Sequence, residues 1–242
     1  MAGDGIDLYV GLLDGIDSSQ VYADCYAILS LEEKRRAGRF VLDQQSRQYV
    51  LAHGLLRFAL SNFKSQVAPS EWSFTRDRYG RPFVAAPATG RPVYFSLSHT
   101  DGCVTCAVSD CELVGVDVER VQERGSLWEI ARSAFSADEI AALRGLPPDD
   151  FVDRFFDYWT LKEAYLKARG RGLSLPPDQF SILMSSDEIA IRLMPGMNDD
   201  STRWHFTLRS PSASHRLAIA DGSGTVGGLQ VFLRYWPEAC AT

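Results

Sequence analysis

The 242-residue sequence lacks any hydrophobic run of the length that a membrane-spanning helix needs, which is roughly 18 residues. Its N-terminal MAGDGIDLYV has neither the basic nor the apolar segment of a secretory signal. Hydrophobic residues still make up 45% of the chain and charged residues 23%, a composition that excludes a disordered segment. These features predict a globular, cytoplasmic protein of one large or two small domains.

The chain has five cysteines, an odd number that cannot all pair in disulfide bonds. Without a signal sequence, this number favours free thiols in a reducing compartment. His99, Cys103, Cys106 and Cys111 superficially resemble a zinc site. The stretch CVTCAV is typical of a strand, however, in which residues 103 and 106 point to opposite faces and do not converge on one metal. We interpret these cysteines as small buried hydrophobic residues.

The two common phosphate-binding loops, GxxxxGK[ST] and GxGxxG, are absent. The formal net charge of −6 argues against a nucleic-acid partner. Basic residues nevertheless cluster at 34–39 (KRRAGR), 76–81 (RDRYGR) and 167–171 (KARGR). Such local clusters on an acidic chain favour a small polyanionic ligand, and solvated helix faces and loops are the alternative interpretation.

Hydrophobic periodicity predicts strands and helices in mixed order, which is typical of an α+β fold. Strands are expected at 7–13, 72–77, 79–84, 93–99, 103–109 and 113–119, and again at 180–184, 189–194, 204–208, 216–220 and 229–235. Helices are expected from Leu31, over 47–62, near 126–134, after Ser136, and from 151 to Gly170. Capping boxes, with serine three residues before glutamate, mark two of the helix starts, at Ser30 and Ser136.

The chain also shows a faint internal similarity. CAVSD at 106–110 resembles LAIAD at 217–221, which fits two similar halves that meet near residue 120. We therefore expect an N-terminal half over 1–120 and a C-terminal half over 121–242, with the active site at the interface between them. A short polar link between the strands 103–109 and 113–119 predicts that these two strands form a hairpin.

The stretch VGVDVER, residues 114–120, alternates valines with other residues, as a half-buried strand does. The valines then face a core, and Asp117 and Glu119 share the other face, roughly 6.5–7 Å apart. Two acids on one buried face need a metal ion or a basic partner to offset the cost of burial. The alternative is an edge strand whose acids lie in water.

The helix predicted from 151 to Gly170 carries charges on the apolar face that should pack on the sheet. Lys162 falls in the arc of large apolar side chains, and Glu163 lies at its edge. Lys167, one turn beyond Glu163, flanks the same face. Charged residues on such a face are costly and usually functional. A third carboxylate facing the strand acids would complete a site for Mg²⁺, which prefers oxygen ligands.

Ser98 and His99 are adjacent in the stretch SLSHTDG, which invites a nucleophile–base interpretation. Neighbours on a strand point to opposite faces, so a direct pair has poor geometry, and no GxSxG motif surrounds either serine. A histidine at the end of a strand is instead placed to bind a phosphate or to satisfy the local backbone.

Several motifs occur together: YGRP at 79–82, FSLSHTDG at 95–102, GVDVE at 115–119 and WTLKEAYLKARGRGLSLP at 159–176. In order and spacing they resemble the 4′-phosphopantetheinyl transferases of the surfactin-synthetase-activating (Sfp) type, over roughly residues 30 to 185. The family has a different pattern after its Lys-Glu pair, where this chain has Ala164-Tyr165. The resemblance implies a pseudo-dimeric α+β fold, in which each half has a small antiparallel sheet and a packed long helix.

The resemblance also implies site residues and ligands. Coenzyme A is the expected substrate, with Mg²⁺ as the cofactor and the serine of an apo-acyl or peptidyl carrier protein as the acceptor. The expected metal ligands are Asp117, Glu119 and Glu163. The expected contacts to coenzyme A are Arg81, Ser98, His99, Lys162, Lys167 and one of Lys34, Arg36 and Arg39, with Arg36 preferred. The carriers would serve fatty-acid, polyketide or nonribosomal peptide synthesis, and the enzyme is expected to be a monomer without a membrane or nucleic-acid partner.

The implied reaction is attack of the carrier serine on the β-phosphorus of coenzyme A, with 3′,5′-ADP as the leaving group. Glu163, directly or through water, is the expected proton acceptor, while Asp117 and Lys167 complete the catalytic group and Lys162 or Lys167 steadies the leaving group. A non-catalytic module that binds coenzyme A or a nucleotide is the alternative, although it has no reason to gather three acids at one point.

Overall fold

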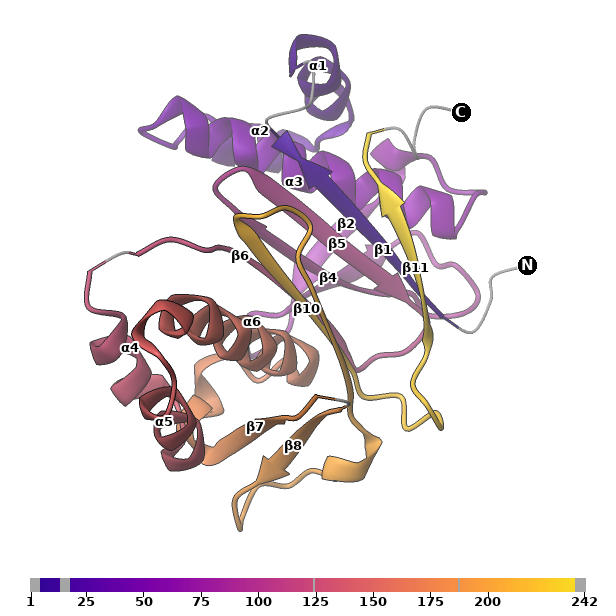
Figure 1. The fold of residues 1–242 in the computed structure, drawn as a ribbon. Coiled ribbons are helices and arrows are strands. Elements are labelled where there is room, and N and C mark those ends of the chain that lie inside the picture. The colour runs from indigo at the N-terminus through magenta and orange to yellow at the C-terminus, as the bar shows by residue number, and fades with distance from the viewer. Residues whose placement is uncertain (1–4, 14–17, 124, 187, 238–242) are drawn as a thin grey trace.

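Two sheets form the middle of the molecule (Figure 1). The computed structural model describes residues 5–13, 18–123, 125–186 and 188–237. The first sheet has the order β11-β1-β5-β4, with β1 (Gly5–Leu12), β4 (Tyr94–Thr100), β5 (Cys103–Ser109) and β11 (Gln230–Tyr235). The second has the order β6-β10-β9, with β6 (Val114–Arg120), β9 (His205–Arg209) and β10 (His215–Asp221). Pairing is antiparallel throughout except between β1 and β11.

The remaining elements lie outside the two sheets. Two small antiparallel hairpins are formed by β2 (Ser73–Arg76) with β3 (Pro82–Ala86), and by β7 (Phe180–Met184) with β8 (Ile189–Leu193). The helices are α1 (Ser18–Ile28), α2 (Leu31–Ala37), α3 (Asp43–Phe63), α4 (Leu127–Ala134), α5 (Ala137–Arg144) and α6 (Phe151–Arg169). Among the described residues, no helix is long and apolar enough to cross a membrane.

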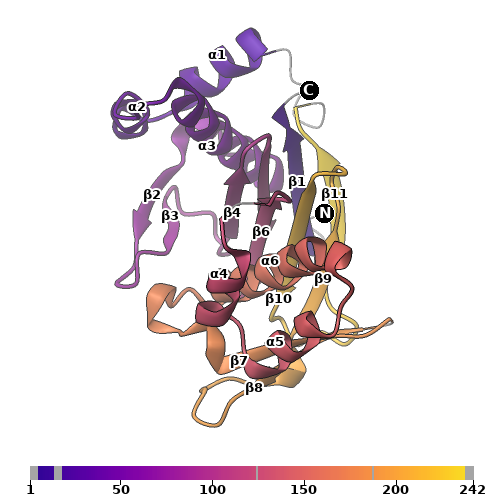
Figure 2. The same cartoon turned by 60° about the vertical axis from the view of Figure 1, so that its left-hand side comes forward.

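Three hydrophobic clusters hold four layers together. The long helix α3 packs on one face of the first sheet, and α6 packs on one face of the second. The opposite faces of the two sheets meet in a third cluster, built from β1, β5, β6 and β10. The order across the molecule is therefore α3, first sheet, second sheet, α6, as Figures 1 and 2 show from two sides.

The predicted α+β fold of two similar halves, each with a small antiparallel sheet and a long helix, is confirmed. The two similar peptides CAVSD and LAIAD lie along β5 and β10, each of which is an inner strand of its sheet. The capping boxes at Ser30 and Ser136 are present, and α6 ends at Gly170, which takes the left-handed conformation with φ of 62°. The division of the chain at residue 120 stays a prediction.

The predicted hairpin between 103–109 and 113–119 is wrong. β5 forms its hairpin with β4 through the Asp101-Gly102 turn, and β6 pairs with β10 more than ninety residues later. A short polar link indicates only a change of direction, and here it carries the chain from the first sheet to the second. The helix α1 was not predicted from the sequence.

The edge strands β4 and β6 meet through side chains. Every second residue of β4 bears a hydroxyl that accepts an N–H from β6: Ser96 from Val116 at 3.0 Å, Ser98 from Val118 at 3.3 Å, and Thr100 from Arg120 at 3.2 Å. These contacts satisfy amides that an edge strand otherwise leaves unpaired. They also hold the edge of the first sheet against the edge of the second at the place where Asp117 and Glu119 lie.

Candidate active site

The two faces of β6 have different neighbours. Val114, Val116 and Val118 lie in the core between the sheets, as their alternation predicted. On the other face, a Cβ atom built on Gly115 would lie 2.0 Å from the carbonyl oxygen of Ala164 in α6. Glycine at this position therefore lets the backbone of α6 approach the strand directly. This close packing brings the acids of β6 beside the charged residues of α6.

Asp117 forms the buried centre of the site, with a relative exposure of 3%. Its Oδ1 accepts hydrogen bonds from the ammonium of Lys167 at 2.6 Å and from the hydroxyl of Ser98 at 2.8 Å. The same ammonium donates to Ser98 Oγ at 2.8 Å. Ser98 also accepts the N–H of Val118. Its hydroxyl is thus fully engaged in holding Asp117 and Lys167 in place.

Glu119 is held between the two halves of the chain. The indole N–H of Trp159 donates to Oε1 at 3.2 Å, and the Thr100 hydroxyl lies 3.5 Å from Oε2. Burial, followed by the negative charge of Asp117, raises the pKa of Glu119 to about 7. Burial and Asp117 also raise the pKa of Glu163. The acids of β6 and Glu163 thus lie close enough to influence one another's pKa, and the Lys167 ammonium contacts Asp117.

These residues fit a divalent cation. Asp117 Oδ2 is buried and has no hydrogen-bond partner among the described residues, so a carboxylate oxygen is free for one more positive group. Within residues 5–13, 18–123, 125–186 and 188–237, no three acidic, histidine or cysteine side chains gather as a complete metal cage. Mg²⁺ commonly binds to one or two carboxylates and takes its other ligands from water and substrate phosphates.

The raised pKa of Glu119 predicts how stability depends on pH in the absence of divalent cations. The unfolded chain releases this proton near pH 4.5, whereas the folded protein releases it near 7. The contribution of Glu119 to stability is therefore full below pH 4.5 and is lost as the pH rises through 7. In EDTA, Glu119→Gln should remove this part of the pH dependence and raise Tm at pH 8 by a few degrees. A variant whose Tm follows the wild-type profile between pH 4.5 and 8 would contradict the assignment.

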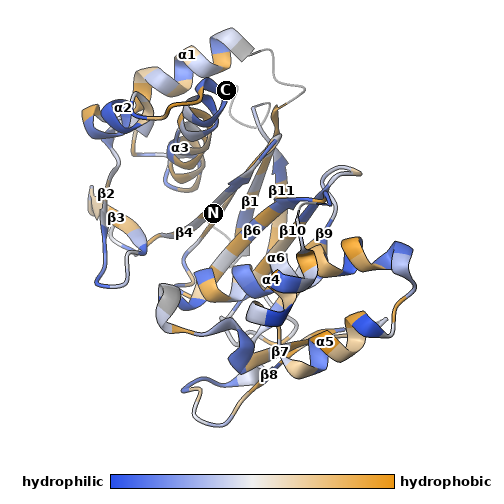
Figure 3. Cartoon of the chain, turned by 90° about the vertical axis from the view of Figure 1, so that its left-hand side faces the viewer, coloured by the Kyte–Doolittle hydropathy of each residue, from blue (hydrophilic) through white to orange (hydrophobic). Residues whose placement is uncertain are grey.

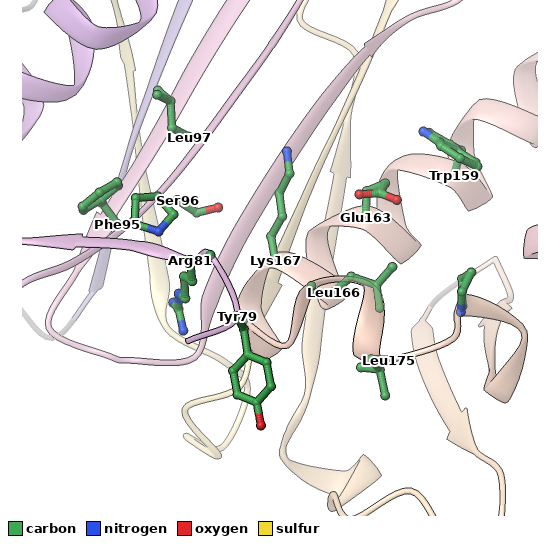
Figure 4. Close-up of a pocket in the computed structure, with 15 residues that line it drawn as sticks. Tyr79, Arg81, Phe95, Ser96, Leu97, Trp159, Glu163, Leu166, Lys167 and Leu175 are labelled. Atoms are coloured by element: carbon green, nitrogen blue, oxygen red, sulfur yellow. The ribbon is translucent and has the colours of Figure 1, made fainter. Parts of the chain in front are cut away.

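A cavity of about 540 Å³ opens beside Glu163 and Lys167. Its lining joins the turn before β3, the strand β4, the helix α6 and the segment after α6. Figure 4 shows Glu163 and Lys167 on neighbouring turns of α6, with Ser96 and Arg81 beside the same space. Much of the remaining wall is apolar, including Tyr79, Phe95, Leu97, Trp159, Leu166 and Leu175. The cavity combines a charged corner with an extended apolar wall.

Arg81 lines this cavity, whereas His99 is not among the residues that line it. The Arg81 guanidinium donates to the carbonyl of Glu112 at 2.8 Å and to that of Ala168 at 3.3 Å, which ties its turn to the end of α6. His99 follows Ser98 on β4 and has an exposed surface. The protein around its ring and the charge of Lys167 nevertheless lower its pKa, which favours the neutral imidazole.

The structure does not bring Lys162 into this cluster. Its ammonium is buried and donates to both carboxylate oxygens of Glu139, at 2.9 and 2.7 Å, and to the carbonyl of Phe180 at 2.8 Å. With its three N–H bonds used inside the protein, Lys162 joins α6 to α5 and β7 and is not open to a phosphate. This corrects the expectation that Lys162 contacts the ligand.

Arg36 lies on the exposed surface of α2, with its guanidinium 5.6 Å from the centre of the Tyr49 ring. Its assignment to the ligand, like that of Lys34 or Arg39, stays a prediction.

Sequence reasoning missed the two residues that hold Glu119, which are Thr100 and Trp159. Thr100 lies in the motif SLSHTDG and Trp159 in the motif WTLKEAYLK. Their place in these motifs was the sequence signal that could have indicated a role in the site.

The arrangement fits a group-transfer enzyme, because Glu163 and Lys167 line a cavity and Lys167 also binds Asp117. Family models agree with this. One described as "4′-phosphopantetheinyl transferase, N-terminal" matches residues 17–111, and one described as "4′-phosphopantetheinyl transferase superfamily" matches residues 113–220. A 4′-phosphopantetheinyl transferase of Bacillus subtilis is 31% identical over 171 residues, which cover 70% of this chain and 73% of that protein. The chain belongs to the 4′-phosphopantetheinyl transferase family.

One further relative and one solved structure match a smaller share of this chain. The 4′-phosphopantetheinyl transferase HetI of Nostoc sp. is 34% identical over 62% of this chain, and the match spans 63% of that protein. A holo-(acyl-carrier-protein) synthase of Bacillus anthracis, solved with coenzyme A (3′,5′-ADP), covers 44% of this chain at 18% identity, with a TM-score of 0.36. That structural likeness is too low to bear on the site.

Proposed function

We propose that this protein transfers the 4′-phosphopantetheine arm of coenzyme A to a serine of an apo-acyl or peptidyl carrier protein and releases 3′,5′-ADP. The observation that carries the proposal is a cavity of about 540 Å³ lined by Glu163 and Lys167, with Asp117 bound to Lys167 and Glu119 electrostatically coupled to them. A pyrophosphate needs positive charge near its oxygens, and an attacking serine needs a base. Membership of the family supports the same reaction.

The active site is proposed to lie between the halves 1–120 and 121–242. Ser98 comes from the first sheet, whereas Glu163 and Lys167 come from the helix that covers the second. In this arrangement the protein mainly positions two substrates and neutralises charge, because phosphoryl transfer needs little covalent work from the enzyme. A site built entirely from one chain supports the proposal that the protein acts as a monomer.

Asp117, Glu119 and Glu163 are proposed to hold Mg²⁺, which when bound would neutralise charge on the pyrophosphate oxygens. The Lys167 ammonium lies beside Asp117 and can shift toward an incoming phosphate and steady the leaving group. Glu163 is the proposed proton acceptor for the carrier serine, directly or through water. Its raised pKa makes it a better base than an ordinary carboxylate.

Ser98, His99, Arg81 and Arg36 are proposed to position coenzyme A. For Ser98 this role is indirect, because its hydroxyl already binds Asp117 and Lys167. The cytoplasm is the proposed location, which the free thiols of Cys103 and Cys111 support.

The test is incubation of the protein with coenzyme A, Mg²⁺ and an apo-carrier domain, followed by mass spectrometry of the carrier. The wild-type protein should add the mass of one phosphopantetheine arm, and Glu163→Gln should reduce turnover by roughly 10²–10⁴-fold because a general base is lost. Glu188→Gln changes an exposed glutamate in the same way and should leave turnover unchanged.

Two outcomes would contradict these proposals separately. If the turnover of Glu163→Gln is within a few fold of that of the wild type, Glu163 is not the general base. Binding of coenzyme A by the wild-type protein without any mass gain on carriers of the fatty-acid, polyketide and peptide classes would indicate a non-catalytic binding module instead.

A further inference from the structure

The helix α2 and its connection to α3 form an exposed surface of unusual composition, called here the α2–α3 surface and defined as residues 31–42. It exposes large apolar side chains, with relative exposures of 93% for Val41, 57% for Leu42 and 65% for Leu31. Figure 3 shows the hydrophilic helix α2 running into this hydrophobic connection. Apolar side chains gathered this way at a surface are typical of an interaction site.

The same surface is basic, although the whole chain has a net charge of −6. Lys34, Arg35, Arg36 and Arg39 fall within six residues, and residues 34–42 contain no acid. The three arginines are exposed. A partner for this surface must therefore combine acidic groups with an apolar contact, because a basic cluster is followed directly by a run of apolar side chains.

The surface is held rigidly from beneath. Glu33 of α2 accepts the N–H of Ser30 at 2.8 Å and the Arg57 guanidinium of α3 at 2.7 Å. His53 of α3 lies 3.1 Å from its other oxygen. Hydrogen bonds from His53 and Arg57 outweigh burial and lower the pKa of Glu33 to about 2, so this carboxylate stays charged. A fixed helix can bind a partner without a large loss of conformational entropy.

The α2–α3 surface adjoins the active site. Directly after it, Gln44 donates to the Asp101 carboxylate at 2.7 Å, and Gln48 donates to the carbonyl of Thr100. Thr100 in turn lies beside Glu119. The start of α3 is therefore tied to the β4–β5 turn at the end of the strand that carries Ser98. A protein bound on residues 31–42 would stand next to the carboxyl cluster.

We propose that the α2–α3 surface docks the apo-carrier protein through acidic and apolar groups on that protein. This rests on the proposed transfer reaction, because the second substrate is then a folded protein. Such a substrate does not fit into a cavity of about 540 Å³ and must bind at the rim with only its serine reaching the acids. Val41 and Leu42, just before the Gln44 that binds the β4–β5 turn, offer the apolar contact, and Arg35 offers the charge.

Val41→Glu and Leu42→Glu test the apolar contact. Each places a carboxylate where an acidic domain would bind, so KM for the apo-carrier should rise roughly tenfold or more. The kcat and the KM for coenzyme A should change less than twofold, because neither residue touches the cavity lining. The matched control is Val226→Glu, since Val226 is 99% exposed and lies in the loop between β10 and β11.

Arg35→Glu tests the charge. Its KM for the carrier should rise at low ionic strength, and the difference from wild type should shrink as salt is added, because exposed charges are screened. Arg35 is exposed, so the change should leave the melting temperature unaltered.

The proposal is overturned if Val41→Glu and Val226→Glu have the same KM for the carrier. It is also overturned if wild-type protein is dimeric by light scattering and Val41→Glu is monomeric, since a second copy would then cover this surface. Failure of the transfer reaction itself would look different, because the wild-type protein would then modify no carrier.

Discussion

Replacing Gly115 with alanine should disrupt the contact between β6 and α6 and abolish detectable transfer. The added Cβ would lie 2.0 Å from the carbonyl oxygen of Ala164 and 2.6 Å from the amide nitrogen of Ala168. Both are backbone atoms of α6, so no side-chain rotation relieves the overlap and the helix itself must move. We expect a loss of about 3 kcal/mol or more in the free energy of unfolding.

The loss of activity follows from the same displacement. Glu163 and Lys167 lie on the turns of α6 that meet Gly115, whereas Asp117 stays on β6, so any movement of the helix separates the groups that must act together. A misplacement of about 1 Å can cost roughly 100-fold in rate. Thermal unfolding and the carrier mass assay measure the two effects independently.

Gly145→Ala is the matched control. Gly145 ends α5 with an ordinary helical φ of −80°, and the nearest atom to an added Cβ is 3.5 Å away. Alanine there should leave stability and turnover close to wild type. If Gly115→Ala melts within about 1 °C of Gly145→Ala, the packing of α6 on β6 is looser than the structure indicates.

Much of this site follows from local periodicity. The strand period of two placed Asp117 and Glu119 on the face away from the valine core, and the helical period placed Glu163 and Lys167 on the side of α6 that meets the sheet. Both periods are properties of the backbone, so they are readable without knowledge of the fold. The contact between the two elements was expected from the charged residues on the sheet-facing side of the helix and from the family resemblance, and it is present as the Lys167–Asp117 pair.

Long-range partners were not readable in this way. Lys162 lies on an apolar arc of α6, as expected. Its ion-pair partner Glu139 comes from a different helix, and the lysine is buried. The roles of Thr100 and Trp159 depend on how β4 and α6 both approach Glu119. Sequence periodicity indicates on which face of a helix or strand a residue lies. It does not indicate which distant element packs against that face.

The second large effect is expected from Lys167→Met. The Lys167 ammonium contacts Asp117, a buried carboxylate, and its side chain is 30% exposed compared with 5% for that of Asp117. Removing it leaves an acid without its counter-charge beside two further carboxyl groups. Because Lys167 is partly open to water, we expect a cost of about 2 kcal/mol, less than for a fully buried pair. Turnover should fall roughly 10²–10³-fold, as expected when one group that stabilises transition-state charge is lost.

The response of this variant to Mg²⁺ separates the proposed metal site from a purely structural ion pair. In the wild-type protein the ammonium already offsets part of the charge on Asp117, whereas in Lys167→Met a divalent cation is the only group left to do so. Saturating Mg²⁺ should therefore raise the melting temperature more in Lys167→Met than in the wild type.

In the double variant Asp117→Asn/Lys167→Met the unpaired charge is gone, so stability should recover without Mg²⁺ and the added effect of the cation should disappear. Equal stabilisation of the single and double variants by Mg²⁺ would place the cation away from Asp117, and the carboxyl cluster would then have to act through Lys167 alone.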